Sequence, residues 1–263
     1  MDILLASLIF VFGTIFGSFA NMLIHRLPNN LSLGGRSACP HCQQILGFWE
    51  LWPIVSFLCL QGKCKHCKHK ISLRYLLVEI IMGFLFLGAW AWVLPTTLLE
   101  FLFLIKLVCL SFFALIVFVI DYEHFLIMDA LVLVFGLIFF VLNLTTDLYI
   151  GQGFKSTLAG FWGALGGSLP FYLIWFFSKG RLMGFGDVKL MLTLGLVLGF
   201  PIILVGVFIA VMLGGILGAS LLLTGKAGLK TALPFGCFLS SGAIIALIYG
   251  EQLLSWYLSI IAV

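Results

Sequence analysis

Long apolar stretches, separated by short polar segments, run through almost the whole chain. Each is near the ~20 residues with which an α-helix crosses the ~30 Å apolar core of a bilayer. The apolar residues are continuous rather than alternating, which argues against a transmembrane β-barrel. We expect about eight transmembrane helices, the sixth of them short for a full crossing. They are predicted at residues 3–24, 75–94, 101–120, 130–146, 157–177, 188–200, 202–223 and 234–249.

Composition supports an all-α polytopic membrane protein. Hydrophobic residues make up 63% of the 263 residues and charged residues only 9%, which is far from the balance of a soluble domain. The first stretch lacks a basic start and an Ala-x-Ala exit, so we expect a retained span rather than a removable signal. The predicted domains are a first span at 1–25, a small cytoplasmic loop domain at 26–74 and a transmembrane core at 75–263.

Basic residues predict the orientation. Twelve of the 14 Lys and Arg residues lie in the segments 26–74, 178–189 and 224–231. Cytoplasmic loops carry such an excess, so we place these segments inside and the N-terminus outside. The same topology brings Asp121 and Asp187 to the cytoplasmic face. The net charge of +4 is explained by this bias, together with contact to anionic headgroups, and gives no reason to invoke nucleic acid.

Four of the seven cysteines form two Cys-x2-Cys knuckles, Cys39 with Cys42 and Cys64 with Cys67. This spacing is typical of zinc ribbons, in which each knuckle offers two thiolates to a tetrahedral ion. All four ligand positions would be cysteine, so the zinc would be structural and would order the loop. A pair of disulfides is the alternative, and the reducing cytoplasm argues against it.

The segment Ile45–Leu60 between the knuckles is apolar and carries Trp49 and Trp52. It is a poor span, because it is short and is interrupted by Glu50 and Pro53. We expect it to pack against the membrane surface.

Acidic residues at the edge of a membrane segment are expensive and suggest a functional site. Asp187 ends the motif Gly184-Phe185-Gly186-Asp187, between two apolar stretches. The two glycines would permit unusual backbone angles and the close approach of another chain. The ordinary alternative is that Asp187 is the N-cap of the helix that follows.

Asp121 directly follows the apolar run Ser111–Ile120, at a helix C-terminus where the macrodipole disfavours negative charge. A solvated acidic turn with Glu123 and Asp129 is the competing interpretation. We favour Asp121, because it sits closest to the membrane boundary shared with Asp187. Two such carboxylates can share a proton, so that one acts as the base on a water and the other polarises a carbonyl group.

Glu79 is a further acid within an apolar stretch, about one helical turn from Arg74 and Tyr75. A snorkelling or paired side chain is the ordinary explanation for such a residue.

Taken in order, these motifs resemble those of the type IV prepilin peptidases, the leader peptidases and N-methyltransferases of pilus, type II secretion and competence systems. The resemblance covers nearly the whole chain. It rests on Gly17-Ser18-Phe19-Ala20-Asn21, His25-Arg26-Leu27-Pro28, both knuckles, Ile71-Ser72-Leu73-Arg74-Tyr75 with Glu79, Asp121, Gly184-Phe185-Gly186-Asp187 and Leu233-Pro234-Phe235-Gly236.

The resemblance implies an aspartic endopeptidase with Asp121 and Asp187 as its catalytic pair, supported by Gly184, Gly186, Asp129 and Glu79. Its substrates would be prepilins or pseudopilins, cut on the cytoplasmic side between Gly and Phe. Many members then methylate the new N-terminus with S-adenosylmethionine, an activity associated with the loop domain. No Gly-rich dinucleotide fingerprint supports that cofactor independently.

The chain departs from the family pattern at two motifs, and Asp129 is retained, so the expected peptidase chemistry is unchanged. Cys237 stands where Pro is usual, and Ile127-Met128-Asp129 replaces Ile-Pro-Asp. Glu50-Leu51-Trp52-Pro53 is similar to the Gram-positive competence branch. Two rival functions stay open from the residues alone. A transporter or channel would hold acids near mid-membrane and show internal repeats, and an assembly factor would bind pilins without cutting them.

Overall fold

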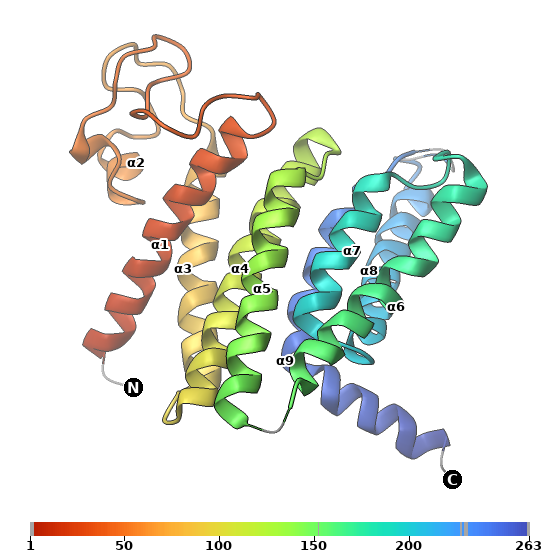
Figure 1. The fold of residues 1–263 in the computed structure, drawn as a ribbon. Helices are drawn as coiled ribbons and strands as arrows, with labels where there is room; N and C mark the ends of the chain where they lie inside the picture. Colours follow the sequence, from red (N-terminus) through yellow and green to blue (C-terminus); the bar gives the residue numbers. More distant parts are fainter. Residues whose placement is uncertain (1–2, 152, 227, 229–230, 262–263) are drawn as a thin grey trace. The chain divides into compact units, whose positions relative to one another are not determined.

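The computed structural model describes residues 3–151, 153–226, 228 and 231–261. In that part of the chain the regular structure is helical, and its β pairing is limited to two isolated antiparallel bridges (Figure 1). The expected all-α membrane fold is therefore confirmed. The chain folds as two compact units, Met1–Ile116 and Val117–Val263. The predicted division at residues 25 and 74 stays a prediction.

The first unit contains a helix pair and the cysteine-bearing loop between its members (Figure 1). Helices α1 (Ile3–Arg26) and α3 (Leu73–Val93) pack against each other. The loop holds a short 3₁₀ turn, η1 (Phe48–Glu50), and a single-turn helix, α2 (Val55–Cys59). Helix α4 (Leu98–His124) begins in this unit and ends in the second.

Small residues let the backbones of α1 and α3 approach closely. A Cβ on Gly13 would lie 2.8 Å from the Cα of Gly83, and one on Gly17 would lie 2.6 Å from the Cα of Glu79. Small-residue contacts of this kind are typical of helices that pack within lipid, where there is no hydrophobic force between them. The tight pair gives the loop a rigid base.

The second unit is a helical bundle built on the end of α4. Its other helices are α5 (Asp129–Ile150), α6 (Lys155–Ser178), α7 (Phe185–Leu198), α8 (Ile202–Leu223) and α9 (Phe235–Ile261). The backbones of α6 and α7 are in direct contact at Gly163 and Gly195, where a Cβ on either glycine would overlap the backbone of the other helix. Helix α5 is joined to α7 near this contact, because the Asn143 side-chain amide donates a hydrogen bond to the Leu196 carbonyl at 2.8 Å.

All eight predicted apolar stretches are helices, and in the described part of the chain seven helices are long and apolar enough to cross a membrane. The exception is α7, whose 14 residues rise about 21 Å, less than the ~30 Å apolar core. Its end nevertheless reaches the start of α6, because the Phe200 N–H donates to the Ala159 carbonyl at 2.9 Å. The expected arrangement of about eight apolar helices, the sixth of them short for a full crossing, is confirmed.

Candidate active site and candidate metal centre

The four predicted zinc ligands come together in the first unit. The sulfur atoms of Cys39, Cys42, Cys64 and Cys67 all lie within 4.8 Å of one another, and the Cys39 and Cys67 sulfurs are 3.9 Å apart. Four thiolates at 2.3 Å from a zinc ion would be about 3.8 Å apart. All seven cysteines are free thiols, so the disulfide alternative is not what the fold adopts. The donor set and spacing fit a structural zinc ion.

The two knuckles repeat one turn. The Gln43 N–H donates to the Cys39 carbonyl at 2.8 Å, and the Lys68 N–H donates to the Cys64 carbonyl at 3.0 Å. Gln43 and Lys68 both have positive φ angles, 57° and 59°. Each knuckle thus reverses the chain in the same way and presents its two sulfurs on one side.

The protonation of the cysteine thiols also favours the binding of a cation. The backbone N–H groups of Cys67 and His66 lower the pKa of the Cys64 thiol to about 6, so its thiolate is available at neutral pH. The His69 N–H lowers the pKa of Cys67, but burial and three neighbouring thiols outweigh it and raise that pKa to about 11. The four thiols do not all lose their protons unless a cation offsets the charge.

Glu79 lies in the first unit, at 8% exposure in α3. Its Oε2 accepts a hydrogen bond from the Ile54 N–H at 2.8 Å, and Ser18 of α1 also interacts with the carboxylate. Of the two ordinary roles expected for this residue, pairing is the one observed. Glu79 joins the loop to α3, whereas both predicted catalytic aspartates lie in the second unit.

Asp121 lies in the last turn of α4, where it is only 6% exposed. The unfavourable macrodipole of α4 is compensated by α9, whose first residues face this carboxylate. The Cys237 N–H donates to Asp121 Oδ2 at 3.2 Å, and the Gly236 N–H also interacts with it. A Cβ on Gly236 would lie only 2.9 Å from the same oxygen and 3.1 Å from the Asp121 Cγ, so a larger residue would displace this carboxylate. The sequence analysis identified the motif Leu233-Pro234-Phe235-Gly236 at the start of α9, but it did not predict that this motif contacts Asp121.

Asp187 lies in the first turn of α7, outside the seven candidate spans. The N-cap of α7 is Gly184, so the expectation that Asp187 is the N-cap is wrong by three residues. From the third helical position its carboxylate reaches back to the Gly184 N–H. Burial, and then the negative charge of Asp121, raise the pKa of Asp187 to about 6, and the Gly184 N–H offsets this in part. The two aspartates therefore lie within electrostatic range of each other.

Gly184 and Gly186 were expected to permit unusual backbone angles and a close approach of another chain segment, and only the second of these is observed. Gly184 has φ −74° and ψ 148°, and neither glycine has a positive φ angle, so the expected unusual backbone angles are absent. Close approach is observed at Gly186, where a Cβ would lie 3.1 Å from the Ile127 Cβ. The glycine lets the segment before α5 pack directly on the start of α7.

Asp129 is the first residue of α5 and forms an ion pair with Lys189 of α7. The Lys189 ammonium donates to both Asp129 oxygens, at 2.7 Å and 2.9 Å, and lies 5.1 Å from the centre of the Phe185 ring. Sequence reasoning used Lys189 only as an orientation signal, because its partner is 60 residues away. The pair joins the start of α5 to the turn of α7 that carries Asp187.

Two other acids have different surroundings. Glu123, the competing candidate to Asp121, is exposed and lies 3.9 Å from His124. Asp147 is 4% exposed and accepts hydrogen bonds from the N–H groups of Ser156 and Thr157, both at 2.8 Å. It caps the start of α6, a structural role that the sequence reasoning missed.

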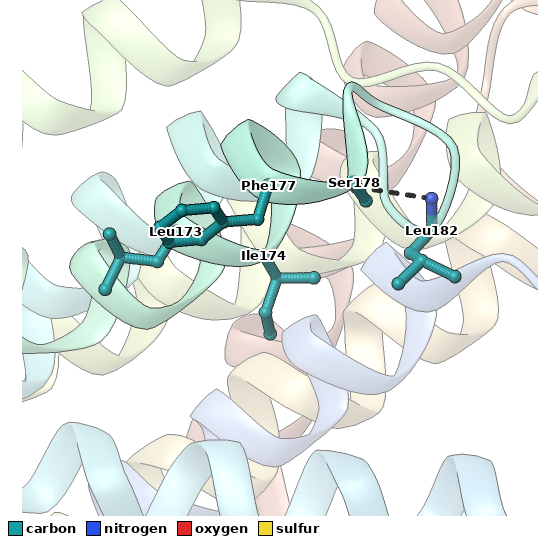
Figure 2. A pocket seen from close by; sticks show the side chains of 5 residues that line it. All are labelled: Leu173, Ile174, Phe177, Ser178 and Leu182. Atoms are coloured by element: carbon teal, nitrogen blue, oxygen red, sulfur yellow. Dashed lines mark hydrogen bonds between the residues drawn. The ribbon is translucent and has the colours of Figure 1, made fainter.

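An apolar cavity of about 390 Å³ lies at the end of α6 (Figure 2). Two of the lining residues are joined by a hydrogen bond, in which the Leu182 N–H donates to the Ser178 hydroxyl at 3.5 Å. Neither aspartate is part of its wall. Its lining consists of Leu173, Ile174, Phe177, Ser178 and Leu182.

Comparisons with known proteins define the class as a membrane peptidase with a separate N-terminal domain. Residues 11–93 match the bacterial peptidase A24 N-terminal domain, and residues 108–219 match the type IV leader peptidase family. No solved structure was found to match the chain.

Curated relatives extend the match to nearly the whole chain. A prepilin leader peptidase/N-methyltransferase of Bacillus subtilis is 35% identical over 96% of this chain and 97% of its own. Proteins of the same description from Stutzerimonas stutzeri and Aeromonas hydrophila are 33% and 31% identical, over 94% and 96% of this chain and 92% and 93% of their own. The chain belongs to the type IV leader peptidase family.

Proposed function

We propose that this enzyme is an aspartic endopeptidase that removes the short basic leader of prepilin-like proteins, between Gly and Phe, at the cytoplasmic face. The proposal is supported by Asp121 and Asp187, which lie at the ends of α4 and α7 and within electrostatic range of each other. The leader of a membrane-inserted prepilin helix would lie at the membrane boundary, which is where helix ends lie. A transporter would instead hold such acids near the middle of its spans.

In this mechanism Asp121 is the base. The N-terminus of the 27-residue helix α9 directs two backbone N–H groups and the positive end of its dipole at this carboxylate. These donors would stabilise charge on the buried carboxylate, and in its ionised form Asp121 would accept a proton from the attacking water.

Asp187 is the acid. It is half-buried, beside the charge of Asp121, and the raised pKa of about 6 favours the protonated form relative to an ordinary aspartate. A protonated carboxyl can donate a hydrogen bond to the scissile carbonyl and stabilise the oxyanion as water adds. The two acids exchange roles as the amine leaves, because the proton taken by Asp121 is available to the leaving nitrogen.

Zinc would be held by the four cysteines and would supply structure rather than chemistry, since no ligand position is left for water. We also propose that cleavage is followed by N-methylation with S-adenosylmethionine, an activity that the names of the relatives carry and that we associate with the loop domain at 26–74. The apolar cavity of Figure 2 does not fit a charged nucleoside, because Ser178 is its one polar lining residue. We therefore assign no residue to the methyl donor and derive no methylation step.

The proposal is tested by coexpressing the enzyme with a prepilin and measuring the mass of the product. Wild-type enzyme is expected to remove the leader and to add the mass of one methylene group at the new N-terminus. Asp121→Ala and Asp187→Ala are each expected to abolish cleavage. Cleavage that persists in both variants would show that another site does the chemistry, and unprocessed but bound prepilin with the wild type would favour an assembly factor.

A further inference from the structure

The loop between the two knuckles exposes an unusual amount of apolar surface. Phe48 is 75% exposed and Trp49 is 71% exposed. The whole set of exposed large apolar side chains in this segment is Ile45, Phe48, Trp49, Leu51, Trp52, Val55 and Leu58. A contiguous patch of this kind marks a surface that meets lipid or another protein.

The patch is aromatic and carries no charge. The rings of Phe48 and Trp49 are 5.6 Å apart and those of Trp49 and Trp52 are 5.2 Å apart, measured between centroids. Glu50 is the one acid of the segment, and its carboxylate is engaged with other parts of the loop rather than with the aromatic rings. Its Oε2 accepts a hydrogen bond from the Gly47 N–H at 2.7 Å, and its Oε1 lies 3.4 Å from His66 Nε2. The aromatic face is left free of charge.

The position of Ile54 gives the depth of the patch. Its N–H is held at 2.8 Å by Glu79, which lies six residues, or about 9 Å, along α3 from its first residue Leu73. The 21 residues of α3 rise about 31 Å, which matches the ~30 Å apolar core of a bilayer. The loop therefore folds back beside a membrane-spanning helix, at a level within the bilayer boundary.

Basic side chains follow the patch along the chain. Lys63, Lys65, Lys68 and Lys70 are all exposed. Lysines beside an aromatic surface are typical of elements that lie on anionic membranes, because the rings enter the headgroup layer and the ammonium groups meet lipid phosphates.

We propose that the segment Phe48–Leu58, called here the interfacial anchor, inserts into the headgroup layer of an anionic bilayer beside α3. Lipid is the partner that the observations favour over a second protein. A hydrogen bond joins the anchor to the spanning helix α3, two of its residues are the Trp that concentrates at membrane interfaces, and lysines complement the charge of the lipid. Glu79 is the latch that holds it at that depth.

The test uses the full-length protein in nanodiscs of phosphatidylcholine and phosphatidylglycerol. The photoreactive residue p-benzoylphenylalanine replaces Trp49, and irradiation is followed by intact-mass analysis for lipid adducts. Gln44, an exposed polar residue of the same loop, is the matched control, and Leu133 of α5, 72% exposed, is the lipid-facing reference. We expect several-fold more lipid adduct at position 49 than at position 44, in the range of position 133.

Equal adduct yields at positions 49 and 44 would overturn the proposal. So would an adduct to an added prepilin that replaces the lipid adduct at position 49, since the patch would then be a protein-docking surface. Phosphatidylcholine alone is expected to lower the yield at position 49, and an unchanged yield would contradict the anionic preference. Adducts form whether or not the chain cleaves a prepilin, so this result is independent of the proposed peptidase activity.

Discussion

Asp121 and Asp187 have different surroundings, which stabilise a negative charge to different extents. Two carboxylates that differ in this way are suited to act as base and acid, whereas two helix caps would not need to differ. Asp121 receives two N–H groups of α9, whereas Asp187 has the single N–H of Gly184 and the repulsion of its partner. The sequence identified both residues, because each interrupts an apolar run. It could not identify the donors to Asp121, because one of them, Cys237, is 116 residues away from it.

The first residue-scale prediction concerns stability. The pKa of Asp187 is raised in the folded state, so folding disfavours its ionised form and stability falls as the pH rises from about 4 through about 6. The shift corresponds to ~3 kcal/mol, which solvent screening of a half-buried group reduces to about 2 kcal/mol. We expect Asp187→Asn to raise the melting temperature at neutral pH while leaving it little changed near pH 4.

Asp121→Asn is the matched control for that measurement, because it removes a charge that α9 stabilises. Its gain in melting temperature at neutral pH is expected to be smaller. An Asp187→Asn variant that is less stable than wild type at neutral pH would mean that helix capping dominates at this position.

The second residue-scale prediction concerns Gly236. An added methyl group would push against Asp121 Oδ2, which lies 2.9 Å from the position of a Cβ. A displacement of about 1 Å at a reacting group lowers rates on the order of 100-fold, so Gly236→Ala is expected to lower kcat by roughly 10- to 100-fold. Gly215→Ala in α8, where no neighbour lies within 4 Å, is the control and should keep full activity. Equal activity of the two variants in a cleavage assay would argue against the contact.

At the scale of elements, apolar length was sufficient to locate every long helix, because a lipid-spanning segment must be apolar along its whole length. The same measure marked α7 as too short for a full crossing, and α7 ends at Leu198, before Gly199 and Pro201. Pairings between elements were missed, since the ion pair of Asp129 and Lys189 depends on tertiary contact. The same is true of Asp147, whose capping of α6 has no local motif.

The ion pair between α5 and α7 leads to an element-scale prediction. Asp129→Lys alone and Lys189→Asp alone each place like charges together, so each is expected to lower leader cleavage severalfold by loosening the turn that carries Asp187. The double variant restores an opposite-charge pair and is expected to recover a large part of the activity. Purely additive losses, measured as kcat in detergent, would show that the ion pair does not position α7.

At the scale of the whole molecule, the two units carry different sites, the cysteine cluster in one and the aspartates in the other. The knuckle spacing was enough to predict the cluster, because two Cys-x2-Cys turns bring four sulfurs together in a small loop. The contact of Glu50 with His66 of the second knuckle was not predictable, since it depends on the tertiary fold of the loop. No sequence pattern indicates which residues of the loop meet in this way.

The zinc prediction belongs to this scale. Purified protein is expected to contain about one zinc ion per chain, measured by elemental analysis. Cys39→Ser combined with Cys64→Ser removes one ligand from each knuckle and should abolish zinc binding and expose the loop to proteolysis. Cys59→Ser, outside the cluster, is the control and should retain zinc. Full zinc occupancy in the double variant would contradict a four-cysteine site.

The most direct test of the central claim is the mass of a coexpressed prepilin in three strains. One carries Asp187→Asn, one Asp121→Asn, and one Glu123→Gln, an exposed acid two residues from Asp121. If Asp121 and Asp187 activate the attacking water, the prepilin keeps its leader in the first two strains and loses it in the third. Leader removal in either aspartate variant, at the wild-type rate, would contradict the account.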